Sequence, residues 1–341
     1  MLSTGKRWLW EVIIFRIMNI PVAMIFFNRP DQFRQIFNAV KQAKPNKLFL
    51  IQDGPRDNHP EDLESINLCR KVCEDIDWEC EVYRNYSEVN LGCGKRVSSG
   101  ITWAFNFVDR LMIFEDDTLP DFSWFIFCDE LLERYRYDQR IGMITGVNHV
   151  GKYDAGGLSY FFATYGSIAG WATWKRVWDN YDYDVSYAAN DYYMSCLSRT
   201  IYPKWKKKPL MKTIRSLYLA SKNNVKRKSW SGPFGFSVML NSQLIIVPSV
   251  NLITNIGVTP GATNGGTTKA IIPKKLQSIF DAPSYEMKFP LTHPLFVIGD
   301  KNYCDLWLGV MSGGNSCLSR FCRKIESYIR IIVVKYLKLY K

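Results

Sequence analysis

Three consecutive acidic residues, Glu115, Asp116 and Asp117, are the strongest candidates for chemistry in this sequence. They follow four apolar residues, 111–114, and Pro120 comes shortly after them. The apolar run predicts a strand buried on both faces, with the acids at its carboxyl end, where open α/β sheets bind ligands. Adjacent carboxylates repel one another unless a cation neutralises them, and oxygen ligands suit Mg²⁺ or Mn²⁺. A solvated acidic turn is the alternative, but the flanking residues favour a metal site.

A glycine-rich stretch, residues 90–100, could hold phosphate. It carries Gly92, Gly94, Lys95 and Arg96 where a predicted helix begins. Backbone N–H groups at a helix N-terminus bind phosphate, and either cation could stabilise a departing pyrophosphate. The stretch matches neither the dinucleotide-binding pattern nor the P-loop, so by itself it is a weak signal.

Three tryptophans, Trp171, Trp174 and Trp178, fall within a short segment. Their rings could fill the core as a wedge, or could form a platform on which a sugar or a base stacks. The sequence leaves both interpretations open, and under the second one Trp171 contacts the ligand.

The elements that would position these groups alternate along the chain. We expect strands over residues 21–27, 47–51, 80–83, 111–114 and 141–145, helices over 33–40, 61–76, 97–108 and 122–135, and late strands over 244–247 and 250–253. This alternation predicts an α/β fold with a mostly parallel, doubly wound sheet flanked by helices.

Composition limits the class of protein. The chain has 341 residues, 47% of them hydrophobic, which is enough for a large core. A net charge of +12 predicts an anionic partner such as nucleotide phosphates or acidic lipid. No nucleic-acid recognition motif is present, so we expect no nucleic acid to bind. The nine cysteines include no CxxC pair, which favours reduced thiols in the cytoplasm over zinc or disulfide patterns.

The chain shows signs of membrane contact without a membrane span. Charges and Pro21 interrupt the apolar residues 8–27, so we expect no transmembrane helix there. Residues 192–280 contain no acid but many cations, and residues 321–341 form an apolar helical stripe with cations largely off it. Such a basic helix predicts peripheral attachment to the anionic inner face of the cell membrane, with docking onto the domain as the alternative.

Several segments, in this order, resemble one protein family. They are Asn28-Arg29-Pro30, Asp53-Gly54-Pro55-Arg56, residues 90–100, the acid triplet, residues 170–174 and residues 251–257. Together they resemble a bacterial, family-2-like group of nucleotide-diphospho-sugar glycosyltransferases of the GT-A fold, sometimes labelled hemolytic-protein-like. The resemblance divides the chain into an N-terminal extension (1–20), a GT-A domain (21–265), and a C-terminal extension (266–341) that ends in the basic amphipathic helix.

The resemblance implies an activity and roles for single residues. A sugar would move from a nucleotide-diphosphate donor, with a UDP-sugar favoured, to a glycan or lipid-linked acceptor in surface-polysaccharide synthesis, with Mn²⁺ or Mg²⁺ as cofactor. Asp117 looks like the metal ligand of a DxD-type motif, and Glu115 and Asp116 would face the ribose or the donor sugar. The remaining donor-binding residues implied are Asp53, at the nucleotide base, with Asn28 and Arg29 in the same pocket.

An inverting transfer also needs a base that takes the proton of the acceptor hydroxyl. Residues 192–280 contain no acid, so the candidates for this base are Asp179, Asp182, Asp184 and Asp191. We favour Asp182, with Asp191 as the second choice. His149 is an alternative base or ligand. A retaining route stays open.

Two positions depart from the family pattern. Ser231 follows Trp230 where the family often has an acid, and Asn264 stands in a region where it often has a histidine. These departures support an alternative function, a non-catalytic binder of nucleotide sugars or carbohydrate on a degenerate GT-A fold. A nucleotidyltransferase would usually carry a glycine-rich N-terminal loop, and residues 25–30 contain no glycine.

Overall fold

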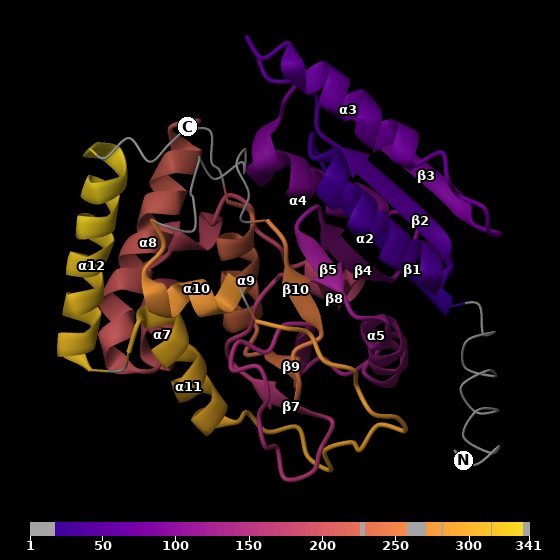
Figure 1. The fold of residues 1–341 in the computed structure, drawn as a ribbon. Helices are drawn as coiled ribbons and strands as arrows, with labels where there is room; N and C mark the ends of the chain where they lie inside the picture. Colours follow the sequence, from indigo (N-terminus) through magenta and orange to yellow (C-terminus); the bar gives the residue numbers. More distant parts are fainter. Residues whose placement is uncertain (1–17, 226–228, 258–270, 281, 315, 337–341) are drawn as a thin grey trace.

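The computed structural model describes residues 18–225, 229–257, 271–280, 282–314 and 316–336 (Figure 1). Within these residues one large sheet has eight strands and a small sheet has two. The large sheet contains β1 (Met18–Phe26), β2 (Pro45–Gln52), β3 (Glu81–Tyr86), β4 (Arg110–Glu115), β6 (Ile141–Thr145), β7 (Tyr160–Ala163), β8 (Trp171–Trp174) and β9 (Leu244–Pro248). The small sheet pairs β5 (Thr118–Pro120) with β10 (Ile253–Asn255).

The large sheet is mostly parallel, as the alternation of elements predicted. Its strand order is β3-β2-β1-β4-β8-β6-β9-β7. β1 pairs in parallel with both β2 and β4, and β2 with β3. β8 is antiparallel to β4 and to β6, and β7 is antiparallel to β9. The predicted α/β fold with a mostly parallel sheet is therefore confirmed, and the arrangement is consistent with a Rossmann-like GT-A fold.

Helices flank the sheet. They are α2 (Pro30–Ala43), α3 (Glu61–Val72), α4 (Gly92–Ala104), α5 (Phe122–Arg134), α6 (Lys175–Trp178), α7 (Asp191–Thr200), α8 (Lys204–Lys222), α9 (Ser231–Leu240), α10 (Lys274–Phe280), α11 (Lys301–Ser312) and α12 (Cys317–Tyr336), with a short 3-10 helix, η1 (Ser186–Ala189). Right-handed crossovers put α2 and α3 on one face of β1–β3 and α4 on the other. Figure 1 shows this arrangement.

The core follows from the apolar spacing. Phe33, Ile36, Phe37 and Val40 lie on one side of α2 and are all buried. The four apolar residues 111–114 of β4 have no exposed surface, as expected for a strand covered on both faces. A smaller apolar cluster lies under α7, α8 and α9, and comprises Val185, Met194, Leu197, Ile214 and Phe236.

The strand order creates a switch point beside β1. From β1 the chain passes to β2 on one side, and it later forms β4 on the other side of β1. The connections that follow β1 and precede β4 therefore run over opposite faces of the sheet. In open α/β sheets a crevice forms at the carboxyl ends of such strands. The segments after β1, β2 and β4 carry Asn28, Asp53 and Asp116, so the fold gathers these candidates at one edge.

Two further sequence expectations concern a membrane span and the N-terminal residues. Within the described residues no helix is long and apolar enough to cross a membrane. The first strand begins at Met18, so residues 18–20, expected in the N-terminal extension, belong to the sheet, while residues 1–17 lie outside the described part.

Candidate functional site

The acid triplet lies in a tight turn at the carboxyl end of β4. Glu115 is the last residue of that strand and pairs in register with Ile25 of β1. The Thr118 hydroxyl donates to the Glu115 carbonyl oxygen at 2.9 Å and accepts from the Glu115 N–H at 3.2 Å. This pair of bonds closes the turn and fixes Asp116 and Asp117 between β4 and β5.

The three carboxylates repel one another in a partly dehydrated setting. Burial, followed by the charges of Asp117 and Asp116, raises the pKa of Glu115 to about 8. Burial and Asp117 raise the pKa of Asp116 to about 6, and burial also raises the pKa of Asp117. All three acids are therefore costly to ionise without added positive charge.

Arg29 is the cation that faces this turn. It follows β1, and its Nη1 lies 3.6 Å from Asp116 Oδ1. Its charge lowers the pKa of both Asp116 and Asp117, although burial outweighs it. Arg29 Nε is buried without a hydrogen-bond partner, and the Phe27 N–H reaches Asp116 Oδ2 at 3.4 Å. The predicted neighbours Arg29 and Asp116 thus lie together.

Asn28 is held by a buried acid from α3. Its Nδ2 donates to Asp62 Oδ1 at 2.6 Å, and Arg56 donates to both oxygens of Asp62 at 2.8 Å. These hydrogen bonds lower the pKa of the Asp62 carboxyl, Arg56 first among them. Asp62 therefore ties the segment after β1 to the segment after β2.

Asp53 holds the start of α4. Its Oδ1 accepts the N–H groups of Leu91 and Gly54 at 2.9 and 3.0 Å, and its Oδ2 accepts that of Gly92 at 2.9 Å. Burial raises the Asp53 pKa, while these three backbone hydrogen bonds lower it. Asp53 therefore caps the N-terminus of α4 from outside the helix. Its hydrogen bonds also order the glycine-rich turn, which the sequence predicted as a possible phosphate site.

The first turns of α4 carry a thiol towards the acids and a guanidinium away from them. Burial first, and then the charges of the acid triplet and of Asp53, raise the pKa of Cys93 to about 12. Arg96 Nη2 donates to the carbonyl oxygen of Asn85, and to its Oδ1 at 2.8 Å. Arg96, a predicted donor-binding residue, is thus directed to β3 and is buried.

A distant glycine packs against Asp117. The Ile256 N–H donates to the Asp117 carbonyl oxygen at 2.9 Å, which extends the pairing of β10 with β5. A Cβ on Gly257 would lie 2.6 Å from both Cβ and Oδ2 of Asp117, closer than Cβ atoms approach other heavy atoms. Residue 257 must therefore be glycine if the Asp117 carboxylate is to keep this position.

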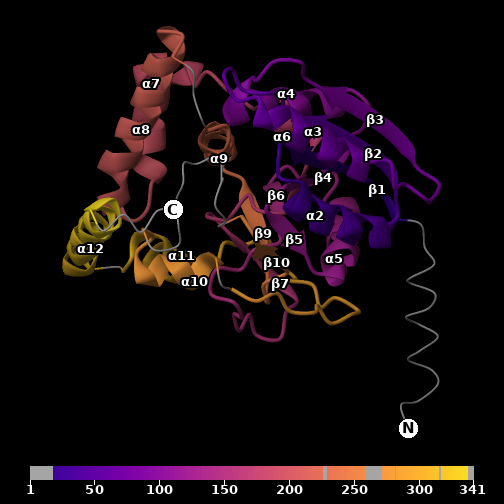
Figure 2. The same cartoon turned by 45° about the horizontal axis from the view of Figure 1, so that its top comes forward.

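Three other predicted residues are not joined to the acids. Trp171 is 1% exposed and stacks on Trp230 with ring centroids 5.5 Å apart, so it fills the core instead of offering a free platform. Asp182 accepts the Asp184 N–H at 3.0 Å and the Ser186 N–H and hydroxyl at 2.6 and 2.8 Å. Asp191 is exposed at the start of α7, which Figures 1 and 2 place well away from β4.

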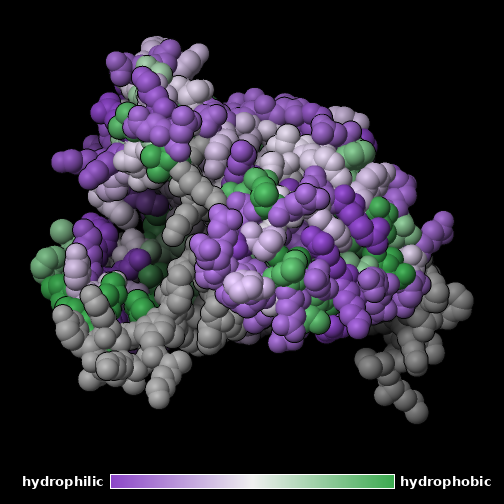
Figure 3. All heavy atoms as spheres, turned by 90° about the horizontal axis from the view of Figure 1, so that it is seen from above, coloured by the Kyte–Doolittle hydropathy of each residue, from purple (hydrophilic) through white to green (hydrophobic). Residues whose placement is uncertain are grey.

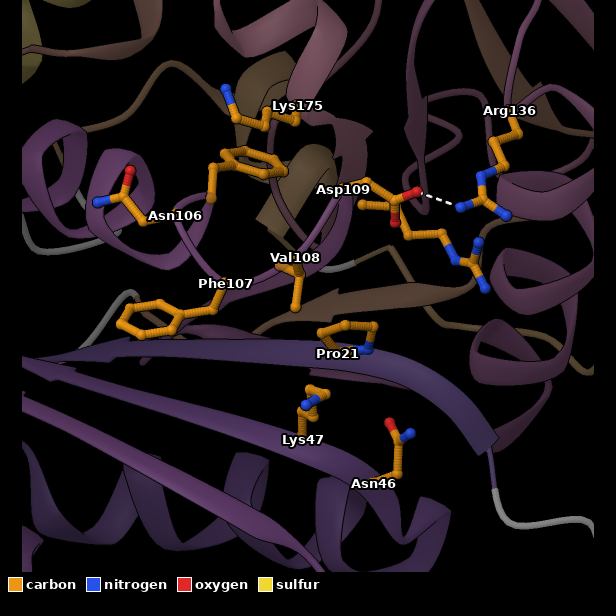
Figure 4. A pocket seen from close by; sticks show the side chains of 11 residues that line it. Pro21, Asn46, Lys47, Asn106, Phe107, Val108, Asp109, Arg136 and Lys175 are labelled. Atoms are coloured by element: carbon orange, nitrogen blue, oxygen red, sulfur yellow. Dashed lines mark hydrogen bonds and ion pairs between the residues drawn. The ribbon is translucent and has the colours of Figure 1, made fainter.

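A cavity of about 630 Å³ lies at the opposite, amino-terminal edge of the strands (Figure 4). Several cations line it, but acids in or beside it pair with them: Arg136 with Asp109, Lys175 with Asp179 at 2.6 Å and Lys47 with Glu81 at 2.7 Å. This cavity has little charge left for an anionic ligand and lies away from the acid triplet.

The donor atoms at the acid triplet suit a hard divalent cation. No group of three or more histidine, cysteine or acidic side chains converges on a metal position within the described residues. The protein would therefore supply one or two carboxylates, which is the usual protein share in sites where Mg²⁺ also binds substrate phosphates. The raised carboxylate pKa values give a physical reason for such a cation to bind here.

Comparisons with known proteins add little. No protein-family model matches the sequence, and no curated protein matches it. Among solved structures, the crystal structure of UDP-glucose pyrophosphorylase complexed with UDP-glucose is similar, with a TM-score of 0.34 and 8% identity. The similarity covers 77% of this chain and 97% of that chain. A similarity this distant supports no statement about the activity of this chain.

Sequence reasoning gave no role to Gly257, Asp62 or Cys93. Gly257 ends one of the segments on which the family resemblance rests, and Cys93 lies in the glycine-rich stretch, so both stood in marked regions. Asp62 had no signal beyond being an acid in the first turn of a predicted helix, and only the fold reveals its contact with Asn28.

Proposed function

We propose that this protein transfers a sugar from a nucleotide-diphosphate donor, which binds at the carboxyl ends of β1, β2 and β4. The observation that carries the proposal is the acid triplet after β4, half-buried at the switch point, with the pKa of all three carboxyls raised. A donor pyrophosphate together with a divalent cation would supply the charges that this edge lacks.

The parts of the site would act as follows. Asp117 has no hydrogen bond or ion pair with the side chain of another described residue, so we assign it to the metal, with Asp116 beside it. A bound Mn²⁺ or Mg²⁺ would neutralise charge on the pyrophosphate. Arg29, which lies beside Asp116, and the exposed Lys95 of α4 would stabilise the departing nucleotide diphosphate. We retain a UDP-sugar as the favoured donor and a glycan or lipid-linked acceptor.

The transfer forms one bond, breaks another and releases one proton. An acceptor hydroxyl oxygen bonds to the anomeric carbon, the bond from that carbon to the phosphate oxygen breaks, and the nucleotide diphosphate leaves with the electron pair. A base then holds the hydroxyl proton. Asp182 and Asp191 stay the sequence-based candidates, and no hydrogen bond or ion pair in the described residues joins either one to the acid triplet.

A second function, donor binding without turnover, is favoured by one set of observations. Ser231 stands where the resembled family often has an acid, and its hydroxyl lies 3.1 Å from the Ser229 hydroxyl. The Asp182 carboxylate is already occupied by the backbone and side chain of its own loop. A site with an intact donor pocket and no base would bind nucleotide sugars and leave them unchanged.

A thermal-shift screen tests the proposal. The full chain is heated with UDP-, GDP-, CMP- and dTDP-linked sugars, with and without Mn²⁺, and in parallel as the Asp117→Ala variant. A ligand that binds only the folded state raises its melting temperature. We expect a Mn²⁺-dependent rise with one nucleotide class, absent in Asp117→Ala. A well-folded sample that responds to none of the donors would contradict both functions, whereas binding without release of nucleotide diphosphate would select the second.

A further inference from the structure

Helix α12 packs on the protein through its polar side. Arg323 donates from Nη1 to the carbonyl oxygen of Met311 in α11, and Glu326 accepts the backbone N–H of Lys274 in α10 at 2.9 Å. Both side chains are only partly exposed. The helix is therefore fixed to α10 and α11 by polar contacts, the reverse of the usual packing of an amphipathic helix.

The apolar side of α12 faces solvent. Its residues recur at spacings of three and four and so share one helical face. They are Leu318, Phe321, Ile325, Tyr328, Ile329 and Ile332, with exposed fractions of 70, 59, 43, 72, 54 and 51%. In Figure 3 hydrophobic atoms gather at the lower left, over α12. A contiguous apolar surface of this kind marks an interaction site.

The surroundings of this apolar face are positively charged. Glu326 is the only acid between residues 317 and 336, and Arg330 pairs with it at 2.7 Å, while Lys324 is exposed. The first turn of α8 lies against α12, since the Arg320 guanidinium stands 4.1 Å from the centre of the Trp205 ring. The partner of this face must therefore accept cations beside an apolar contact.

Helix α8 adds to this charge. It lines a groove of about 590 Å³ with five cations on one side, Lys204, Lys207, Lys208, Lys212 and Arg215. No acid occurs between residues 192 and 280, so none in that segment offsets them. Figure 2 shows one end of α8 beside α12, in agreement with the contact between Arg320 and Trp205, so the two helices are neighbours.

We propose that the exposed face of α12 docks onto an anionic lipid bilayer, with the cations of α8 and α12 contacting the headgroups. A bilayer surface offers apolar chains directly beneath negative charge, which matches the two properties of this surface at once. A second copy of the chain would match the apolar face but would bring the same positive charge against it. The docking does not depend on the function proposed above.

Vesicle co-sedimentation of the full chain tests the docking. We expect binding to phosphatidylcholine vesicles that contain phosphatidylglycerol, weaker binding at high salt, and little binding to pure phosphatidylcholine. The double variant Ile325→Asp, Ile332→Asp should bind at least about tenfold more weakly, because it places charges in the apolar face. A control pair on α3, Leu63→Asp with Leu68→Asp, alters residues that are also exposed and should bind like wild type.

A second double variant shows whether any loss of binding comes from a folding defect of the first. Sedimentation equilibrium tests whether the face instead binds a second copy of the chain. Lys207→Glu with Lys212→Glu changes two exposed residues of α8 and should also weaken vesicle binding. The proposal would be overturned if the wild-type protein did not bind anionic vesicles, or if both variants bound them as well as wild type. A wild-type dimer that the Ile325→Asp, Ile332→Asp variant dissociates, with no vesicle binding, would assign the face to a second copy instead.

Discussion

At the scale of single residues, Asp117 is positioned by backbone from a distant part of the chain. The contact with Gly257 leaves no room for a Cβ, whereas a Cβ on Gly235, in α9, would meet nothing within 4 Å. This pair of glycines offers a matched test of whether the position of Asp117 matters.

The Gly257→Ala variant should keep its fold and lose at least about tenfold in metal-dependent nucleotide affinity, because the new methyl group displaces the Asp117 carboxylate. Titration calorimetry of the nucleotide that passes the thermal-shift screen, with Mn²⁺ present, measures the change. Gly235→Ala should bind like wild type. Unchanged affinity in Gly257→Ala would mean that Asp117 contributes nothing to binding.

His149 should make the protein sensitive to acid. Burial lowers its pKa from 6.5 to about 4, so the folded state resists a proton that the unfolded chain accepts. Its contribution to stability is complete above pH 6.5 and is lost as the pH falls towards 4, by on the order of 2 kcal/mol at pH 5.

Urea unfolding between pH 7 and pH 5 measures this dependence. The His149→Phe variant should lose less unfolding free energy over that range than wild type, because it has no imidazole to protonate. Equal slopes in His149→Phe and wild type would show that His149 is protonated alike in both states.

Single residues were predictable from the sequence only where neighbours along the chain define them. The acid triplet could be placed at a strand end because the apolar residues 111–114 precede it directly. The burial of Trp171 could not be decided, because its ring partners Trp230 and Phe234 come much later in the chain. The role of Gly257 depends on the pairing of β10 with β5, which no local pattern reveals.

At the scale of elements, the start of α4 depends on one side chain from the end of β2. Asp53 accepts three backbone N–H groups there, two of them at the glycine-rich turn. The Asp53→Ala variant should therefore lose about 1–2 kcal/mol of unfolding free energy even without ligand, as for removal of a helix cap.

Chemical denaturation of the ligand-free protein checks this value. Asp57 is exposed in the same loop, and the Asp57→Ala variant should stay within about 0.5 kcal/mol of wild type. If Asp53→Ala kept full stability but lost nucleotide binding, its carboxylate would serve the ligand alone and not the helix.

The regular elements were largely predictable because their apolar spacing is strong. The predicted strand 141–145 matches β6, and the predicted helix 122–135 matches α5 to within one residue. No strand was predicted at β7 or β8, since both are short and lie in a segment rich in glycine and aromatic residues. Their strand conformation depends on pairing with β9, β4 and β6.

At the scale of the whole molecule, strand order turns local patterns into a site. The sequence predicted parallel strands that end in polar residues, and the order β2-β1-β4 brings those ends together. The sequence favoured membrane attachment of the segment that forms α12 over docking onto the domain, but an amphipathic pattern does not say which side of a helix packs on the protein. Only its contacts with α10 and α11 reveal that the apolar side is left outside.

The central claim is that the acid triplet holds a divalent cation together with a nucleotide diphosphate. Electron paramagnetic resonance tests it directly, because Mn²⁺ loses its free-ion signal when it binds. Wild-type protein and Asp117→Asn are titrated with Mn²⁺ alone and with UDP, GDP, CDP or dTDP in separate series. The account predicts tight Mn²⁺ binding by wild type with one of these nucleotides and weak binding by Asp117→Asn. Equal Mn²⁺ binding by both proteins, or no effect of any nucleotide, would contradict it.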